Sequence, residues 1–259
     1  MYPVRCRHFQ TEYTLMTQNI YDTDSFFEGY SQLPRSLKGL DGAPEWASIR
    51  ALMPPLANAS VADLGCGFGW FCRWAREQSA ASVLGVDVSQ NMLSKAEEMT
   101  SDAHIQYVRE DLETLTLPEN TYDLVYSSLT LHYIANLQGL FEQVYKSLKS
   151  GGWLVFSAEH PIYTAPRNPG WAEDQHKNTL WPINQYLVEG PRTTDWLADG
   201  VVKQHRTFSA YLTMLINTGF TLKHLEEWRP SAEQIDECPE LKVELERPMF
   251  FIMAAQRGE

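Results

Sequence analysis

The sequence predicts an α/β fold of the doubly wound class, in which helices cover both faces of a mostly parallel sheet. Three observations support this prediction. Short apolar segments typical of buried strands recur between residues 60 and 157, amphipathic helical segments separate them, and a glycine-rich turn joins the first strand to the next helix. Alternating strands and helices favour a parallel sheet with right-handed crossovers.

The N-terminal segment differs from the rest of the chain. Residues 1–15 show neither helical nor strand periodicity, so we interpret them as an extension or a misassigned start. Residues 16–42 are polar and aromatic and are expected to form an arm with short helical pieces. We therefore predict an N-terminal arm or cap over residues 1–42 and one α/β domain over residues 43–259.

The elements of the domain are expected in a regular order. A helix begins after Pro44, and another follows the glycine turn. Ser89 is a suitable N-cap for the next helix, and a strongly amphipathic helix runs from Asn136 to a stop at Gly151-Gly152. The expected strands cover residues 60–64, 82–87, 105–108, 122–127 and 153–157.

The stretch after the fifth strand interrupts this order. Residues 159–206 are rich in proline and contain Trp171, Trp181 and Trp196. A long irregular stretch inside a compact domain is usually a lid or a substrate-binding insertion, although three tryptophans also suit a small satellite core. A helix over residues 207–218, closed by Gly219, and two strands over 220–228 and 248–255 are expected to complete the domain.

The charge and the cysteines limit the classes of function. The formal net charge is -12, and an acidic surface repels phosphate backbones and anionic lipid, so we expect no nucleic-acid partner and no membrane partner. No apolar run approaches the ~20 residues that a membrane helix needs. The four cysteines, Cys6, Cys66, Cys72 and Cys238, form no zinc pattern, so we expect no metal. We interpret them as reduced, which suits the cytoplasm.

The most informative segment is the glycine turn after the first strand, Asp63-Leu64-Gly65-Cys66-Gly67-Phe68-Gly69. Glycines at such a turn let the backbone approach a ligand at the carboxyl edge of the sheet. Nicotinamide-dependent oxidoreductases use GxGxxG, with the third glycine one position later. Asp63 would also oppose a pyrophosphate and would suit a ligand with a cationic part.

Two further acids follow the second and third strands. Asp87 can accept hydrogen bonds from ribose hydroxyls, and Asp111 with Leu112 can hold an adenine. Each acid also has an ordinary explanation, such as a turn cap, a helix cap or a solvated loop residue. Three acids at successive strand ends favour a nucleoside-containing ligand over coincidence.

The chain resembles the class I, seven-stranded S-adenosylmethionine-dependent methyltransferases, and within them the type 11 group of small-molecule enzymes. The matching segments are VADLGCGFG (61–69), VLGVDVSQNML (83–93), YVREDLETLTLPENTYDLVYSSLTLHYI (107–134) and LKSGGWLVFS (148–157). The resemblance implies a Rossmann-like, seven-stranded, mostly parallel sheet with an antiparallel edge strand and an aromatic-rich insertion after strand 5. It also implies S-adenosyl-L-methionine as the cofactor, S-adenosyl-L-homocysteine as the product and a small-molecule methyl acceptor.

The resemblance also implies roles for individual residues. Gly65 and Gly67 would face the methionine part, with Asp63 near its ammonium group and Ser127 near the methionyl end. Arg35 is expected to pair with the cofactor carboxylate, with Tyr21 or Tyr30 closing over it. The residues expected around the adenosine are Asp87 on the ribose and Val88, Met92, Asp111 and Leu112 at the adenine.

Three histidines are candidates for a general base, because a hydroxyl or carbon acid needs one and an amine must be neutral. They are His132 after the fourth strand, His160 after the fifth and His205 before the late helix, and each has a structural alternative. Glu159 is a weaker candidate base. Two other functions stay open: a non-catalytic cofactor-binding module and a macromolecular (RNA or protein) methyltransferase. We expect a monomer or a homodimer.

Overall fold

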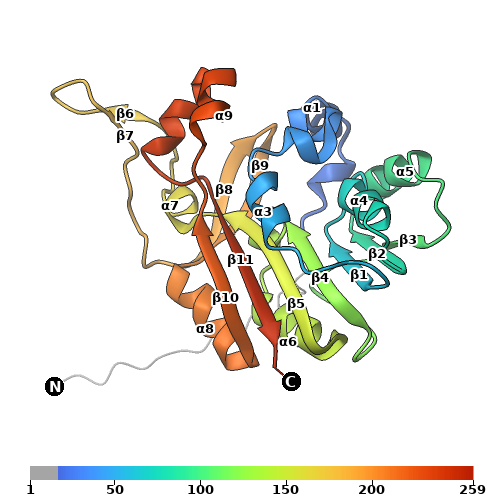
Figure 1. Ribbon diagram of the computed structural model, residues 1–259. Helices are drawn as coiled ribbons and strands as arrows, with labels where there is room; N and C mark the ends of the chain where they lie inside the picture. Colours follow the sequence, from blue (N-terminus) through green and yellow to red (C-terminus); the bar gives the residue numbers. More distant parts are fainter. Residues whose placement is uncertain (1–16, 259) are drawn as a thin grey trace, which may run out of the picture.

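The computed structural model describes residues 17–258, so the expectation for residues 1–15 lies outside the described residues. Its centre is a seven-stranded sheet with the order β10-β11-β5-β4-β1-β2-β3 (Figure 1). Five strands pair in parallel: β1 (Ser60–Leu64), β2 (Ser82–Asp87), β3 (Ile105–Arg109), β4 (Tyr122–Ser128) and β5 (Leu148–Glu159). β11 (Phe250–Arg257) runs antiparallel to β5 and to β10 (Phe220–Glu227).

The predicted seven-stranded, mostly parallel sheet is therefore confirmed. Six strands point the same way, and the antiparallel strand β11 lies one position in from the end of the sheet, where β10 is outermost. The bounds of β1 and β2 agree with the expected strands, and those of β3 and β4 differ by one residue. The central strands β1 and β4 are buried along most of their length, as the middle of a parallel sheet requires, whereas the edge strand β3 is partly exposed.

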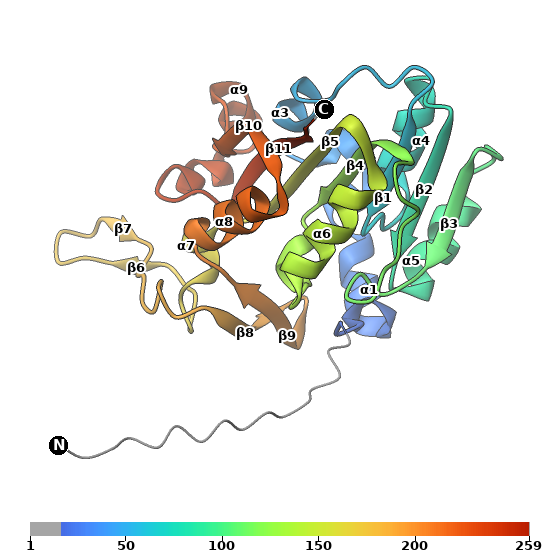
Figure 2. The ribbon, with the colours of Figure 1, turned by 90° about the horizontal axis from the view of Figure 1, so that it is seen from below.

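Helices cover both faces of the sheet. On one face lie α3 (Trp46–Ala51), α4 (Trp70–Glu77) and α5 (Gln90–Glu98), and on the other lie α6 (Leu137–Ser147) and α8 (Phe208–Thr218), which Figure 2 shows beside each other. Side chains alternate along a strand, so neighbouring residues of β4 enter different cores. Leu124 packs with the α3 and α4 residues, whereas Val125 packs with the α6 and α8 residues.

Capping residues explain where several helices begin and end. The Ser89 side chain accepts the Met92 N–H at the start of α5, and Asn136 accepts that of Gly139 at the start of α6. Both starts were predicted. The predicted stop of α6 at Gly151-Gly152 was wrong, because Leu148 is already extended and pairs with Tyr122 of β4. The two glycines lie inside β5.

Two groups of short elements lie above the end of the sheet to which the six parallel strands point (Figure 1). The arm supplies η1 (Ile20–Asp22), α1 (Asp24–Ser31), α2 (Pro34–Leu37) and η2 (Gly39–Gly42), the short helical pieces expected for it. The insertion supplies α7 (Pro161–Thr164) and two hairpins, β6–β7 (Ala172–Glu173, Thr179–Leu180) and β8–β9 (Gly190–Trp196, Ala198–His205). Three further elements are η3 (Leu131–Tyr133), α9 (Ala232–Glu237) and η4 (Pro239–Leu245).

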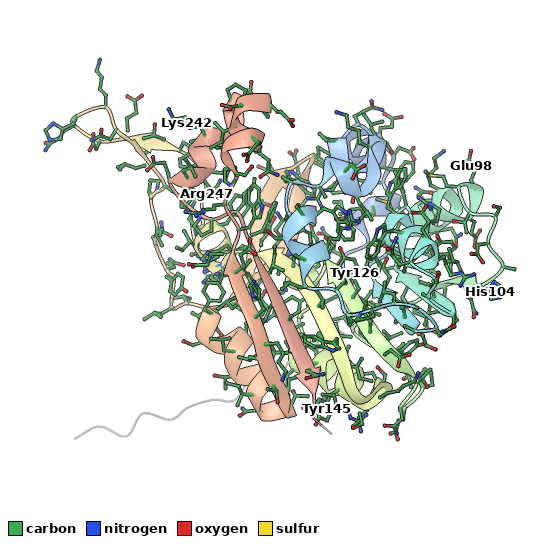
Figure 3. All side chains as sticks on the ribbon, viewed as in Figure 1. Glu98, His104, Tyr126, Tyr145, Lys242 and Arg247 are labelled. Atoms are coloured by element: carbon green, nitrogen blue, oxygen red, sulfur yellow. The ribbon has the colours of Figure 1, made fainter. Side chains whose placement is uncertain are left out.

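A buried arginine joins the insertion to the chain between η4 and β11. The Arg247 guanidinium lies 4.8 Å from the ring centre of Trp171 and 4.3 Å from that of Trp181, and it pairs with Glu244 (Figure 3). Such stacking of a guanidinium on aromatic rings is stabilising. Two of the three insertion tryptophans therefore contribute to a satellite cluster, and Trp196 stands apart from them.

Candidate active site

A cavity lies at the carboxyl ends of the parallel strands. It has a volume of about 1160 Å³, including space open to solvent. Open α/β sheets bind their ligands at this edge. Twelve of the sixteen residues named as candidates for the site line the cavity: Tyr21, Tyr30, Arg35, Gly65, Gly67, Asp87, Val88, Met92, Asp111, Leu112, His132 and Glu159.

The glycine turn forms one wall of the cavity. Gly65 and Gly67 have φ angles of 81° and 51°, in the left-handed region that favours glycine. A Cβ atom on Gly65 would lie 2.1 Å from Thr130 Oγ1, whereas one on Gly67 would meet no atom within 4 Å. The turn therefore needs glycine at residue 65 for packing, and it leaves space for a ligand along residue 67.

Replacing Gly65 with alanine is expected to destabilise the fold. The left-handed backbone costs an alanine about 1–2 kcal/mol, and the contact with Thr130 adds to this. Urea unfolding of the variant measures the loss. Gly170→Ala is the matched control, because a Cβ there meets nothing within 4 Å. Equal stability of the two variants would contradict the strained turn.

Asp87 connects the end of β2 to the glycine turn. One carboxylate oxygen accepts the Gly67 N–H at 2.9 Å, and the other accepts the Ser89 N–H at 2.9 Å. Burial raises the pKa of Asp87, and these two hydrogen bonds oppose that shift. The carboxylate is thus held in one orientation at the cavity wall and can accept further hydrogen bonds from ligand hydroxyls.

Asp111 ties the arm to the loop after β3. Its carboxylate accepts hydrogen bonds from the Thr17 N–H at 2.9 Å and the Thr17 hydroxyl at 2.6 Å. It also accepts the Glu113 N–H at 3.0 Å. Thr17 and Gln18 line the cavity beside Asp111. The arm consequently forms part of the cavity wall, and Thr17 and Gln18 are wall residues that the sequence did not indicate.

A smaller cavity adjoins the first and shares Tyr30, Arg35, Gly65 and Gly67 with it. Asp63 lines this smaller cavity and not the larger one. Its carboxylate accepts a hydrogen bond from the Cys72 thiol at 3.3 Å. Burial raises the pKa of Asp63 to about 7.

Asp63 is expected to make stability depend on pH. Its pKa is higher in the folded protein (about 7) than its usual 3.8, so the folded state binds the proton more tightly. Its stabilising effect is complete below pH 4 and is lost as the pH rises through 7. Between pH 5 and pH 8, the free energy of unfolding should fall by about 2–3 kcal/mol more in the wild type than in Asp63→Asn. Urea titrations at both pH values would show this; parallel changes in the two proteins would refute it.

Arg35 lies where both cavities meet. Its Nη2 donates to both Glu45 carboxylate oxygens, at 3.0 and 3.2 Å. The Glu45 side chain is 0% exposed and that of Arg35 is 22% exposed. Arg35 therefore neutralises a buried carboxylate and still reaches the cavity surface.

Ser127 does not reach either cavity. Its hydroxyl is fully buried and donates to the Leu64 carbonyl at 2.7 Å, which ties β4 to β1. The next residue, Ser128, lines both cavities instead. The structure thus places the neighbouring serine at the position expected for Ser127.

The three candidate histidines occupy different environments. His132 lines the cavity, whereas His160 and His205 do not. His160 is 1% exposed; one ring nitrogen accepts the Ile162 N–H and the other contacts Glu227 at 2.9 Å. His205 is fully buried, with its ring nitrogens 2.8 Å from Thr164 Oγ1 and 2.8 Å from the Tyr186 carbonyl. Both therefore hold the insertion in place, away from the cavity.

The far side of the cavity contains the weaker candidate base, Glu159, and several residues that sequence reasoning did not assign to the site. Glu159 and Trp196 line it, together with Tyr133, Tyr163, Met249 and Phe250. Met249 and Phe250 come from the start of the antiparallel strand β11, for which the sequence holds no ligand signal. Leu129, also in the wall, has a φ of 50°, which places a non-glycine residue in the left-handed region beside the site.

Residues 17–258 contain neither a metal-binding cluster nor a membrane-spanning helix. No group of three or more His, Cys, Asp or Glu side chains is arranged to hold a metal ion within this part of the chain. No helix in it is both long and apolar enough to cross a bilayer.

The sheet is doubly wound, with a GxGxG turn, acids at the ends of β1 and β2 and after β3, and a cavity at the carboxyl edge. These features define a nucleoside-cofactor enzyme of the α/β class. A family model described as a methyltransferase domain matches residues 62–156. An S-adenosylmethionine-dependent methyltransferase of Mesorhizobium loti is 53% identical and has a TM-score of 0.82, and the match covers 85% of this chain and 100% of that one. The chain belongs to the S-adenosylmethionine-dependent methyltransferase family.

Two curated relatives differ in how much of their length is matched. An uncharacterized protein of Haemophilus influenzae is 31% identical over 93% of this chain and 98% of its own. The phosphoethanolamine N-methyltransferase of Plasmodium falciparum is 30% identical over 50% of this chain and 50% of its own. The chain thus spans about half the length of this named relative.

The cofactor of the family is S-adenosylmethionine, and the described residues fit it. The open space along Gly67 and the oriented Asp87 carboxylate suit a nucleoside close to the backbone. Arg35, which faces the smaller cavity, carries a charge opposite to that of the carboxylate of a methionine part. The Asp63 carboxyl group in the same cavity can accept hydrogen bonds from the amino group. When bound, the cofactor supplies an electrophilic methyl group on its sulfonium sulfur.

Proposed function

We propose that the protein transfers the methyl group of S-adenosylmethionine to a small-molecule acceptor bound at the far side of the cavity. The observation that carries this proposal is the aromatic enclosure there. Tyr21 comes from the arm, Tyr133 from η3, Tyr163 and Trp196 from the insertion and Phe250 from β11. An apolar, enclosed space with a few polar groups suits a small ligand better than a polymer.

In this proposal the cofactor lies across both cavities. Asp87 accepts hydrogen bonds from the ribose, and Val88, Met92, Asp111 and Leu112 surround the adenine. Gly65, Gly67 and Asp63 border the methionine part, Arg35 pairs with its carboxylate and Tyr30 covers it. Ser128 replaces Ser127 at the methionyl end, because only Ser128 lines the cavities.

The chain's own residues position the reactants and exclude water. Tyr21 packs edge-on against Tyr30 and Tyr133, with ring centres 5.4 and 6.1 Å apart, and its hydroxyl donates to that of Tyr133 at 3.4 Å. This aromatic group joins the arm to η3 over the cavity. A water-poor, preorganised site favours methyl displacement, because a sulfonium loses its charge in the reaction.

Two features support a small acceptor further. The named relative of Plasmodium falciparum is a phosphoethanolamine N-methyltransferase, which its name assigns to a small molecule. The formal net charge of -12 disfavours a nucleic-acid substrate. We also propose a monomer or homodimer, and a cytoplasmic location, because Cys66 and Cys72 are buried free thiols.

Methyl-labelled S-adenosylmethionine tests this function. The purified protein is incubated with the label and, separately, with a small-metabolite extract, total RNA and total protein. Label in the metabolite fraction alone supports the proposal. Label in RNA or protein alone would establish a macromolecular methyltransferase instead, and cofactor binding without any labelled product would favour a non-catalytic module.

A further inference from the structure

Glu159, the last residue of β5, presents a carboxylate at the aromatic side of the cavity. Lys203 donates a hydrogen bond to its Oε1 at 2.5 Å, and the Lys203 and Glu159 side chains are 5% and 11% exposed. Oε2 is buried and has no hydrogen-bond partner among residues 17–258. A buried acceptor without a partner is destabilising, so this oxygen marks a place where a bound molecule can donate a hydrogen bond.

Lys203 holds the carboxylate in place from the insertion side. Its ammonium group lies 5.1 Å from the ring centre of Trp196 and 5.9 Å from that of Tyr163. Glu159, Tyr163 and Trp196 all line the main cavity, whereas Lys203 lines only the adjoining outer cavity. The lysine thus occupies Oε1 and leaves Oε2 without a hydrogen-bond partner among residues 17–258, on a residue that lines the main cavity.

His132 lies beside Glu159, but the ring nitrogen that it leaves free is a hydrogen-bond donor. Its Nδ1 accepts the Glu159 backbone N–H at 3.3 Å, so the proton of the neutral ring lies on Nε2, 4.0 Å from Glu159 Oε1. Burial lowers the pKa of His132 to about 4, which keeps the ring neutral near pH 7. With one nitrogen occupied and the other protonated, His132 has no free lone pair to accept a proton from an acceptor molecule.

We propose that Glu159 is the catalytic proton acceptor and that the methyl acceptor bears a hydrogen on the nitrogen or oxygen that is methylated. This inference rests on the proposed function and names its substrate class: amines, hydroxyl compounds or ring N–H compounds. The acceptor lone pair forms the new bond to the methyl carbon as the carbon–sulfur bond breaks, and the sulfur keeps that electron pair. The N–H or O–H proton passes to Glu159 Oε2 and then to solvent.

A binding experiment tests this without turnover. With S-adenosylhomocysteine present, calorimetry compares N-methylaniline with N,N-dimethylaniline, and 4-methylphenol with 4-methylanisole. Each pair differs in the hydrogen that Glu159 would accept. In at least one pair, the wild type should bind the hydrogen-bearing compound about 10-fold or more tightly than its methylated partner. Glu159→Gln should lose this difference in affinity. Glu173→Gln, an exposed residue of the same insertion, should keep it.

A second experiment identifies the methylated atom. Products formed from ¹³C-methyl S-adenosylmethionine and a metabolite extract are assigned by NMR. We expect an N-methyl or O-methyl product, and turnover about 10–100-fold lower in Glu159→Gln. The double variant Glu159→Gln/Lys203→Met removes both charges of the ion pair and keeps the volume of the side chains. If it recovers the thermal stability that Glu159→Gln loses but does not recover turnover, Glu159 acts in proton transfer and not only in the structure.

The two proposals can fail separately. A methylthio or C-methyl product from an acceptor that lacked the hydrogen would overturn the role of Glu159 and leave the small-molecule function intact. Unchanged probe preference together with unchanged turnover in Glu159→Gln would also overturn the role of Glu159. If S-adenosylhomocysteine binds but no small molecule is bound or methylated, the proposed function itself fails, and the inference about Glu159 fails with it.

Discussion

Replacing Asp87 with alanine is expected to weaken S-adenosylhomocysteine binding by about 1.5–3 kcal/mol, the scale of a charge-assisted hydrogen bond. Asp87 is fixed at the cavity wall by the N–H groups of Gly67 and Ser89. Its loss removes the proposed ribose acceptor and also releases the glycine turn. Isothermal titration calorimetry measures the change directly.

Two variants separate these effects. Asp87→Asn keeps the shape of the side chain and should retain part of the affinity. Asp22→Asn is the matched control, because Asp22 accepts hydrogen bonds from Ser89 and Asn91 at the same helix start but does not line the cavity. Unchanged affinity in a folded Asp87→Ala protein would reject the ribose assignment.

Replacing Arg35 with alanine is expected to be more costly for stability. Glu45 would then be a fully buried carboxylate without its counter-ion, and breaking a buried pair in this way costs about 3–5 kcal/mol. Cofactor affinity should fall as well, because Arg35 is the proposed partner of the cofactor carboxylate. Urea unfolding and calorimetry report the two losses.

The double variant Arg35→Met/Glu45→Gln distinguishes the two roles of Arg35. It removes both charges at once, so it should recover most of the stability that Arg35→Ala loses, while cofactor affinity stays low. Recovery of both properties would mean that Arg35 acts only as the counter-ion of Glu45. A stable single variant would contradict the burial argument.

Much of the fold could be predicted because its central strands are short, apolar and bounded by turn residues. The strands at 60–64 and 82–87 and the capping of α5 by Ser89 follow from local sequence alone. The end of α6 could not be predicted, because pairing of Leu148 with β4 overrides the glycine stop signal. The α9 and η4 segment has no periodicity strong enough to identify it.

Most of the predicted site residues gather around one cavity at the expected edge of the sheet, but several side chains point in other directions than expected. Strand ends show where ligands bind, yet a shift of one residue turns a side chain to the other side. Glu159 lines the cavity while His160 faces Glu227, and Ser128 lines it while Ser127 bonds to Leu64. The contributions of Thr17 and Phe250 depend on long-range packing, which no local pattern encodes.

We propose that one cavity, built from the glycine turn, the strand ends and the arm, binds the cofactor. Amide hydrogen exchange with and without S-adenosylhomocysteine tests it most directly, with NADH as the control ligand. We predict slower exchange in residues 63–69, 87–92 and 17–35 with S-adenosylhomocysteine and no change with NADH. Protection confined to other segments, or equal protection by NADH, would contradict the account.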